Sequence, residues 1–303
     1  MSTKVNFYNQ IRANNFRTFL LFVLFFILIL GLGATFGFFL GDPIFGLIIT
    51  SIIGIIYGLI AFFAGDRMVL KFMGAKEASK QDYAYYVNTV EGLAIAAGIP
   101  TPKAYIIDTP ALNAFATGRD PKHGAVTVTT GLLNKLNREE LEGVVAHEIA
   151  HIKNYDIRTM LIASILVGIV IIISDFMLRS AIFGGLSGGS RGGGRNSGGG
   201  AAIFLIVAII LAILAPIIAY LIKLTVSRKR EYVADAEGAR LTRNPPALAR
   251  ALEKIAGDSA DFKQASNAYE HMFISKPKKK SFLANMFSTH PPIEERIKLL
   301  KEM

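Results

Sequence analysis

The 303-residue sequence contains no cysteine. This absence excludes disulfide bonds, thiolate metal sites and cysteine nucleophiles together. Any metal ion must therefore be held by histidine and carboxylate side chains. Charged residues are also scarce at 18%, whereas hydrophobic residues make up 52% of the chain and the mean hydropathy is +0.42. Such a composition is too apolar for an ordinary soluble domain, so the chain is predicted to be an integral membrane protein.

The formal net charge of +10 has two possible explanations, a nucleic-acid partner or an anionic membrane surface. The basic residues gather at the ends of apolar runs and in the segment 276–280. This distribution favours the lipid bilayer as the partner, and no nucleic acid is expected.

Two apolar runs, residues 19–40 and 44–64, each have roughly the 20 residues that a helix needs to cross a hydrocarbon core of about 30 Å. Only residues 41–43 separate them, so they are predicted to form a tight membrane hairpin. The first run is too long for a secretory signal and is followed at once by another span, so it is expected to be retained. Residues 160–178 and 201–224 are predicted to form a second membrane hairpin around a glycine-rich loop. The alternative for these two runs is that they stay buried within the protein.

These spans divide the chain into four parts. Residues 1–64 are predicted to form an N-terminal segment and the first membrane hairpin, and residues 159–224 the second membrane hairpin. Residues 65–158 and 225–303 are predicted to be the two parts of one water-soluble domain. The fold class is therefore an α-rich membrane protein with four transmembrane helices and a small α+β domain.

Basic residues flank the spans unevenly. They precede the first span and follow the second and fourth spans, as at Arg12, Arg67 and Arg228. The positive-inside rule then places these flanks, both termini and the domain in the cytoplasm. Arginines in the glycine-rich segment argue in the opposite direction.

The water-soluble part combines helix and strand patterns. Residues 83–97 have helical spacing, whereas residues 104–107 and 125–130 have strand-like composition. Asn137, with Glu140 three positions later, predicts a capping box at the start of a further helix. Together these patterns predict a small α+β domain.

The further helix carries the motif His147-Glu148-Ile149-Ala150-His151. At about 100° per residue, the two histidines lie within roughly 40° of each other on one face. The apolar stripe lies on a different face, at Leu141, Val145, Ile149 and Ile152. Two imidazoles on a shared face predict a zinc site with Glu148 as the proton-handling carboxylate, rather than two core histidines.

A catalytic zinc ion needs a third protein ligand, and the segment after the fourth apolar run offers one. Glu231 would complete a set of two histidines and one glutamate. Asp235, one turn later, could accept the free ring N–H of a ligating histidine. The same spacing also suits an ordinary solvated helix face, which stays the alternative at this point.

Taken together, the two motifs and the hairpins around them resemble the HtpX-type membrane zinc metalloproteases, relatives of the CAAX prenyl endopeptidases. The resemblance includes residues 113–118 and the segment from His290-Pro291 to Arg296. It implies a zincin-like domain that holds one zinc ion per chain, with Glu148 as general base and acid and His290 as a further catalytic residue. It further implies that Arg296 pairs with Asp235 or orders the site.

The resemblance also implies a substrate edge at Asn113, Ala114 and Phe115, to which an extended chain could add. The implied function is zinc-dependent hydrolysis of peptide bonds in misfolded or damaged membrane proteins, in the plasma membrane of a prokaryote. Unfolded soluble chains are further possible substrates. A prenyl-protein processing peptidase and a non-catalytic membrane scaffold with a structural zinc remain the alternatives, and the oligomeric state is open.

The distance of the site from the membrane follows from helix geometry. Glu231 lies seven residues after Leu224, and His151 lies nine before Met160. If each stretch is a continuous helix with a rise of about 1.5 Å per residue, both ligands lie roughly 10–14 Å from the bilayer edge.

Overall fold

A computed structural model of the chain describes residues 7–40, 42–166, 228–258, 274 and 291–303. Most of the second predicted hairpin, the basic segment 276–280 and His290 therefore lie outside the described residues. The predictions made for them stay predictions.

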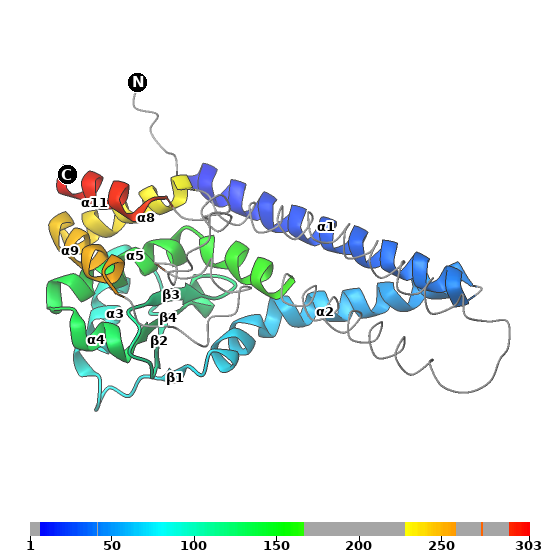
Figure 1. Cartoon of the computed structure of the whole chain (residues 1–303), viewed down its shortest axis with the longest axis horizontal. Helices are drawn as coiled ribbons and strands as arrows, with labels where there is room; N and C mark the ends of the chain where they lie inside the picture. The colour runs from blue at the N-terminus through cyan, green and yellow to red at the C-terminus, as the bar shows by residue number, and fades with distance from the viewer. Residues whose placement is uncertain (1–6, 41, 167–227, 259–273, 275–290) are drawn as a thin grey trace, which may run out of the picture.

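The first predicted hairpin is confirmed. Helices α1 (Phe7–Leu40) and α2 (Pro43–Phe72) run side by side away from the rest of the molecule (Figure 1). Within the described residues, the candidate membrane spans are Ile11–Gly31 and Pro43–Phe72. Pro43 opens α2, and the Asp42 carboxylate accepts hydrogen bonds of 3.0 Å from the N–H groups of Ile44 and Phe45.

Helix α2 does not end with its apolar run. It continues without a break to Phe72, so the boundary predicted at residue 64 falls inside a helix. Its last turns pack against the domain, where Val69, Leu70 and Met73 form one apolar cluster with Phe115 and Leu161. The membrane hairpin is thus joined to the domain by a continuous helix rather than by a linker.

A four-stranded mixed sheet and six helices make up most of the described part of the domain. The strands are β1 (Lys76–Glu77), β2 (Lys103–Ile107), β3 (Ala114–Thr117) and β4 (Ala125–Thr129), in the spatial order β1-β2-β4-β3. The helices are α3 (Ala84–Ala97), α4 (Thr130–Lys135), α5 (Arg138–Lys153), α8 (Arg228–Thr242), α9 (Pro245–Ala256) and α11 (Ile293–Lys301).

The expected strands and helices are present with small shifts at their ends. Strand β2 pairs in parallel with β4 from Lys103↔Ala125 to Ile107↔Thr129, and β3 pairs antiparallel with β4. Helix α3 ends at Gly98, whose φ of 70° is the left-handed conformation that glycine adopts without strain. The mixed sheet with helices confirms the α+β prediction.

Helix α5 lies in the centre of the domain (Figure 1). Its predicted apolar stripe consists of Leu141, Val145, Ile149 and Ile152. The stripe is buried in the main core, where it packs with residues of the sheet, α3 and α9. Because that stripe faces the core, the face that carries His147 and His151 is turned toward α8.

The chain leaves α5 through a turn. Asn154 and Tyr155 interrupt the helix, with φ of 59° at Tyr155, and residues 156–166 then form a second helical stretch. The continuous helix assumed between His151 and Met160 is therefore wrong, and the predicted height of His151 above the bilayer does not follow from helical rise. The turn also brings Asp156 back toward the histidines.

Candidate metal centre

The two histidines are held on a well-defined helix. Asn137 caps α5 by accepting from the N–H of Glu140, while the Glu140 carboxylate accepts from the N–H of Asn137, each at 2.9 Å. This confirms the predicted capping box. One helical turn apart, His147 and His151 direct their Nε2 atoms to one point, where these atoms are 3.2 Å apart.

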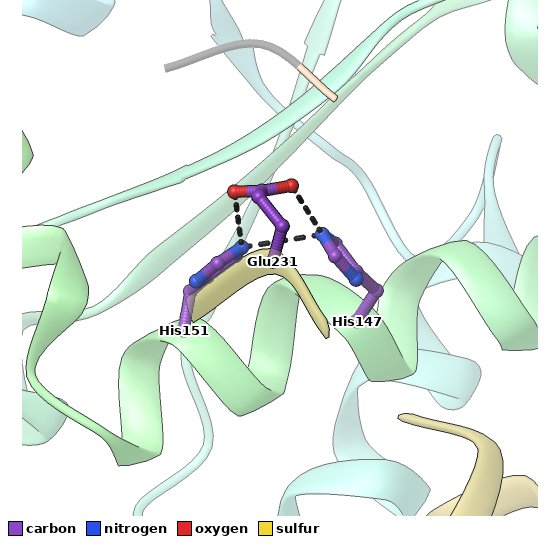
Figure 2. Close-up of side chains that lie close together, drawn as sticks. All are labelled: His147, His151 and Glu231. Carbon is purple, nitrogen blue, oxygen red and sulfur yellow. Dashed lines mark hydrogen bonds and ion pairs between the residues drawn. The ribbon is translucent and has the colours of Figure 1, made fainter. Parts of the chain in front are cut away.

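The third candidate ligand comes from α8. The Glu231 carboxylate lies above both rings, with Oε2 3.7 Å from His147 Nε2 and Oε1 3.6 Å from His151 Nε2 (Figure 2). One ligand atom from each of the three residues falls within 4.8 Å of the others, and all three residues are buried. Two helices far apart in the sequence thus bring the three residues together.

A glycine allows α8 to lie this close to α5. A Cβ atom built on Gly238 would lie only 3.0 Å from the backbone nitrogen of His147. The helices can therefore approach at this crossing only when α8 carries no side chain there. Glu231 lies two turns earlier on α8, so its position above the histidines depends on this contact.

We expect Gly238→Val to move α8 away from α5. Because the added atoms meet backbone rather than a flexible side chain, the substitution should destabilise the protein by about 1–3 kcal/mol and weaken metal binding. Thermal unfolding in detergent and metal content would measure both effects. Gly92→Val in α3 is the matched control, since a Cβ at Gly92 meets nothing within 4 Å. Equal effects of the two substitutions would contradict the role of the crossing.

A carboxylate lies behind each imidazole. His147 Nδ1 is 2.9 Å from Asp235 Oδ1, and His151 Nδ1 is 3.0 Å from Asp156 Oδ2. A carboxylate at Nδ1 favours the tautomer that carries its proton there, so Nε2 presents a lone pair. Two lone pairs 3.2 Å apart repel each other unless a proton or a metal cation lies between them. The donor set therefore fits a bound metal ion.

The charge around the histidines leads to the same conclusion. Among the described residues, four buried carboxylates and two buried guanidinium groups surround or back the two rings: Glu148, Asp156, Glu231, Asp235, Arg230 and Arg296. When all are ionised, the excess is two negative charges, which one divalent cation would balance. Burial lowers the pKa of His151, but Asp156 and Glu231 outweigh it and raise this pKa to about 9. The position beside His151 therefore favours positive charge.

Arg296 makes the contact expected of it. Its Nε and Nη2 atoms donate to the two oxygens of Asp235 at 2.8 and 2.7 Å, and Nη1 lies 3.2 Å from Glu231 Oε2. Although burial raises the pKa of Asp235, the adjacent guanidinium lowers it to about 2. Asp235 is thus held as an anion behind His147, and α11 is tied to the centre.

Glu148 lies on the same helix between the two histidines and is also buried. The backbone N–H of Ala116 in β3 lies near this carboxylate and favours its ionised form. Burial is the largest influence on this group and raises its pKa to about 7. A carboxyl group with such a pKa can both take and return a proton near neutral pH.

Strand β3 is an edge strand of the described sheet and lies next to Glu148. The C=O of Asn113 accepts from the N–H of Thr129 in β4 at 3.1 Å, so the polar groups of Ala114 point away from β4. The Ala114 C=O accepts from the N–H of Ile274 at 3.1 Å. By the same alternation the polar backbone groups of Phe115 face β4, and its buried side chain packs in the cluster with α2.

The structure thus brings together the ligands and partners expected at the centre: His147, Glu148, His151, Glu231, Asp235 and Arg296. His290 lies outside the described residues. The sequence reasoning missed Asp156 and Arg230, whose Nη1 lies 3.3 Å from Asp156 Oδ1. A carboxylate just beyond the end of the histidine helix was the available signal for Asp156.

Comparison with known proteins gives a consistent result. The profile of the family described as "Peptidase family M48" matches residues 80–303. The "Protease HtpX homolog" of Dictyoglomus turgidum is 45% identical over 299 residues, which cover 98% of this chain and 95% of that protein. The protein of the same name from Listeria monocytogenes is 46% identical over 302 residues, covering 98% and 99%.

Among solved structures, the crystal structure of Ste24p from S. mikatae is similar, with a TM-score of 0.48 and 20% sequence identity. The likeness covers 90% of this chain and 61% of that one.

Proposed function

The chain belongs to peptidase family M48 and is a membrane-bound metalloendopeptidase, and we propose that it works with one zinc ion held by His147, His151 and Glu231. The observation that supports this most directly is the pair of Nε2 atoms 3.2 Å apart, each backed by a carboxylate at Nδ1. Two imidazoles and one glutamate leave a fourth zinc position for water, as catalytic sites require.

The remaining residues have distinct proposed roles. When bound, the zinc ion would activate a water molecule and polarise the substrate carbonyl. Glu148 takes the proton of the attacking water and returns it to the leaving amine nitrogen. The Ala116 N–H would favour the ionised form of Glu148, which is the form that accepts the proton. From the sequence resemblance, His290 is proposed to donate to the negative charge that develops on the carbonyl oxygen.

We propose that the substrate binds as an extended chain along β3. The outward-facing backbone groups of Ala114 and Ala116 would pair with the substrate backbone and tolerate many side chains. The N–H of Ile274 already donates to the Ala114 C=O, so a substrate has to displace this contact to use that acceptor. Asn113 and Phe115 would shape this edge indirectly, because their backbone groups face β4.

The membrane location of the protein supports a membrane-protein substrate. Helix α2 passes directly from its apolar span into contact with β3 through the cluster that contains Phe115. We propose that misfolded membrane proteins reach the β3 edge from the bilayer surface. Arg12 near the start of α1 and Arg67 near the end of α2 favour a cytoplasmic domain. Four spans and the domain division of the chain remain part of this proposal.

Removal of the metal should abolish hydrolysis. We expect the protein, purified in detergent with a chelator, to lose hydrolysis of an unprenylated membrane-protein substrate and to regain it when zinc is added. Cleavage of peptide bonds would be measured by gel and mass spectrometry. Parallel additions of cobalt and manganese would test which metal works best. Activity unaffected by chelator, or confined to prenylated substrates, would contradict the proposal.

A further inference from the structure

Two polar side chains in the N-terminal part of α1 are buried. Asn14 is 2% exposed and Thr18 is 6% exposed. Burying an amide or a hydroxyl costs free energy unless the group is hydrogen-bonded. Their partners therefore show what this part of α1 is built to contact.

The Asn14 side chain reaches the metal centre. Its Nδ2 donates to Asp156 Oδ1 at 2.7 Å and to the C=O of Asn154 at 3.0 Å. The other oxygen of the Asp156 carboxylate lies 3.0 Å from His151 Nδ1. A continuous chain of contacts therefore runs from α1 through Asp156 to a proposed zinc ligand.

The orientation of the Asn14 amide follows from its neighbours. Two acceptors, Asp156 Oδ1 and the Asn154 C=O, lie on the Nδ2 side, whereas Arg17 Nη1 donates to Oδ1 at 3.3 Å. A reversed amide would place an acceptor against acceptors and a donor against a donor. The NH₂ group therefore faces Asp156.

A second contact fixes the position of this part of α1. Thr18 Oγ1 donates to the Asn14 C=O at 2.9 Å and is 3.1 Å from Thr159 Oγ1. Thr159 follows Asp156 by one helical turn. The two helical segments are thus joined by the Asn14 amide and, one turn later, by Thr18.

We propose that Asn14 is a positioning residue of the metal centre, which acts through Asp156 to fix the tautomer and direction of the His151 ring. This inference rests on the proposed zinc site. Arg230 holds the same Asp156 oxygen from α8, so a membrane helix and α8 together orient the carboxylate. One side chain of the first membrane hairpin thereby contributes to the affinity of the centre for its metal.

The test measures zinc affinity of the full-length protein in detergent by competition with a chromophoric chelator. Asn14→Leu keeps a similar volume but removes the donor, and we expect zinc to bind about tenfold more weakly, as is typical for the loss of an outer partner of a ligating histidine. The absorption bands of the cobalt-loaded protein should also change, because the His151 ring is reoriented. Asn14→Ala serves the same purpose if the leucine variant does not fold.

Two controls separate positioning from packing. Thr18→Val removes a polar contact between α1 and Thr159 but leaves the Asn14 side chain and Asp156 intact. Asn15→Ala removes a neighbouring amide that accepts from Arg158 at an exposed position. Both should keep wild-type zinc affinity and cobalt bands. A loss with Thr18→Val as large as that with Asn14→Leu would overturn the proposal in favour of simple packing.

A double-mutant cycle tests the route of the effect. If Asn14 acts through Asp156, adding Asn14→Leu to Asp156→Ala should weaken zinc binding little further. Additive losses would overturn the proposed route. If the wild-type protein bound no zinc, the proposed function itself would fail, whereas equal zinc affinity of wild type and Asn14→Leu would overturn this inference alone.

Discussion

Glu148→Gln is expected to lower kcat for peptide hydrolysis by about 10²- to 10⁴-fold while the protein keeps its metal. Glutamine has nearly the same shape and volume as glutamate, so the local structure should persist. It cannot take a proton from water. The loss should therefore appear in catalysis and not in metal content.

The measurement pairs initial hydrolysis rates on a membrane-protein substrate with zinc content by atomic absorption. Glu142→Gln is the matched control on the same helix, since Glu142 Oε1 accepts from the Tyr85 hydroxyl at 2.6 Å and takes no part in the centre. Retained activity in Glu148→Gln would remove Glu148 from its proposed role. Loss of zinc in that variant would instead indicate a structural effect.

Glu231→Ala is expected to weaken zinc binding by more than about 100-fold. Removing a residue that only hydrogen-bonds a ligand typically weakens metal binding by about 10- to 100-fold, and the loss of a ligand should exceed that. The substitution removes the one proposed ligand that α8 contributes and leaves two histidines on one helix. Hydrolysis should fall with metal content, and high zinc concentrations should restore it only in part.

Glu237→Ala on the same helix is the control for this prediction. Its carboxylate is 2.7 Å from Lys153 Nζ and lies outside the proposed ligand set. We expect that variant to bind zinc as the wild type does. If Glu231→Ala and Glu237→Ala bound zinc equally well, another residue would have to be the third ligand.

Local patterns carried much of the prediction from sequence. Three features depend only on neighbours within a few residues: the capping box at Asn137 and Glu140, the apolar stripe of α5 and the end of α3 at Gly98. These features therefore follow from helix periodicity and capping chemistry. The pairing of Arg296 with Asp235 was expected only from the family resemblance.

The parts that sequence did not predict depend on distant contacts. Asp156 reaches His151 because Tyr155 adopts a left-handed conformation. No sequence pattern around the turn predicts this conformation. Asn14 meets Asp156 although 142 positions separate them. The continuation of α2 to Phe72 was missed because its last turns carry the charges of Asp66, Arg67 and Lys71, whereas the buried Val69 and Leu70 show that they pack on the domain.

The distribution of the centre along the chain has a consequence for biosynthesis. Its parts come from α1, α5, α8 and α11, so they leave the ribosome at very different times. At about 5–20 residues per second, the delay between His151 and Arg296 is on the order of ten seconds. During that interval the nascent chain carries Glu148 and both histidines but lacks a complete centre. The protease would thus gain its hydrolytic activity only after α8 and α11 have been synthesised. Other membrane proteins that are still being inserted nearby would be protected from it until then.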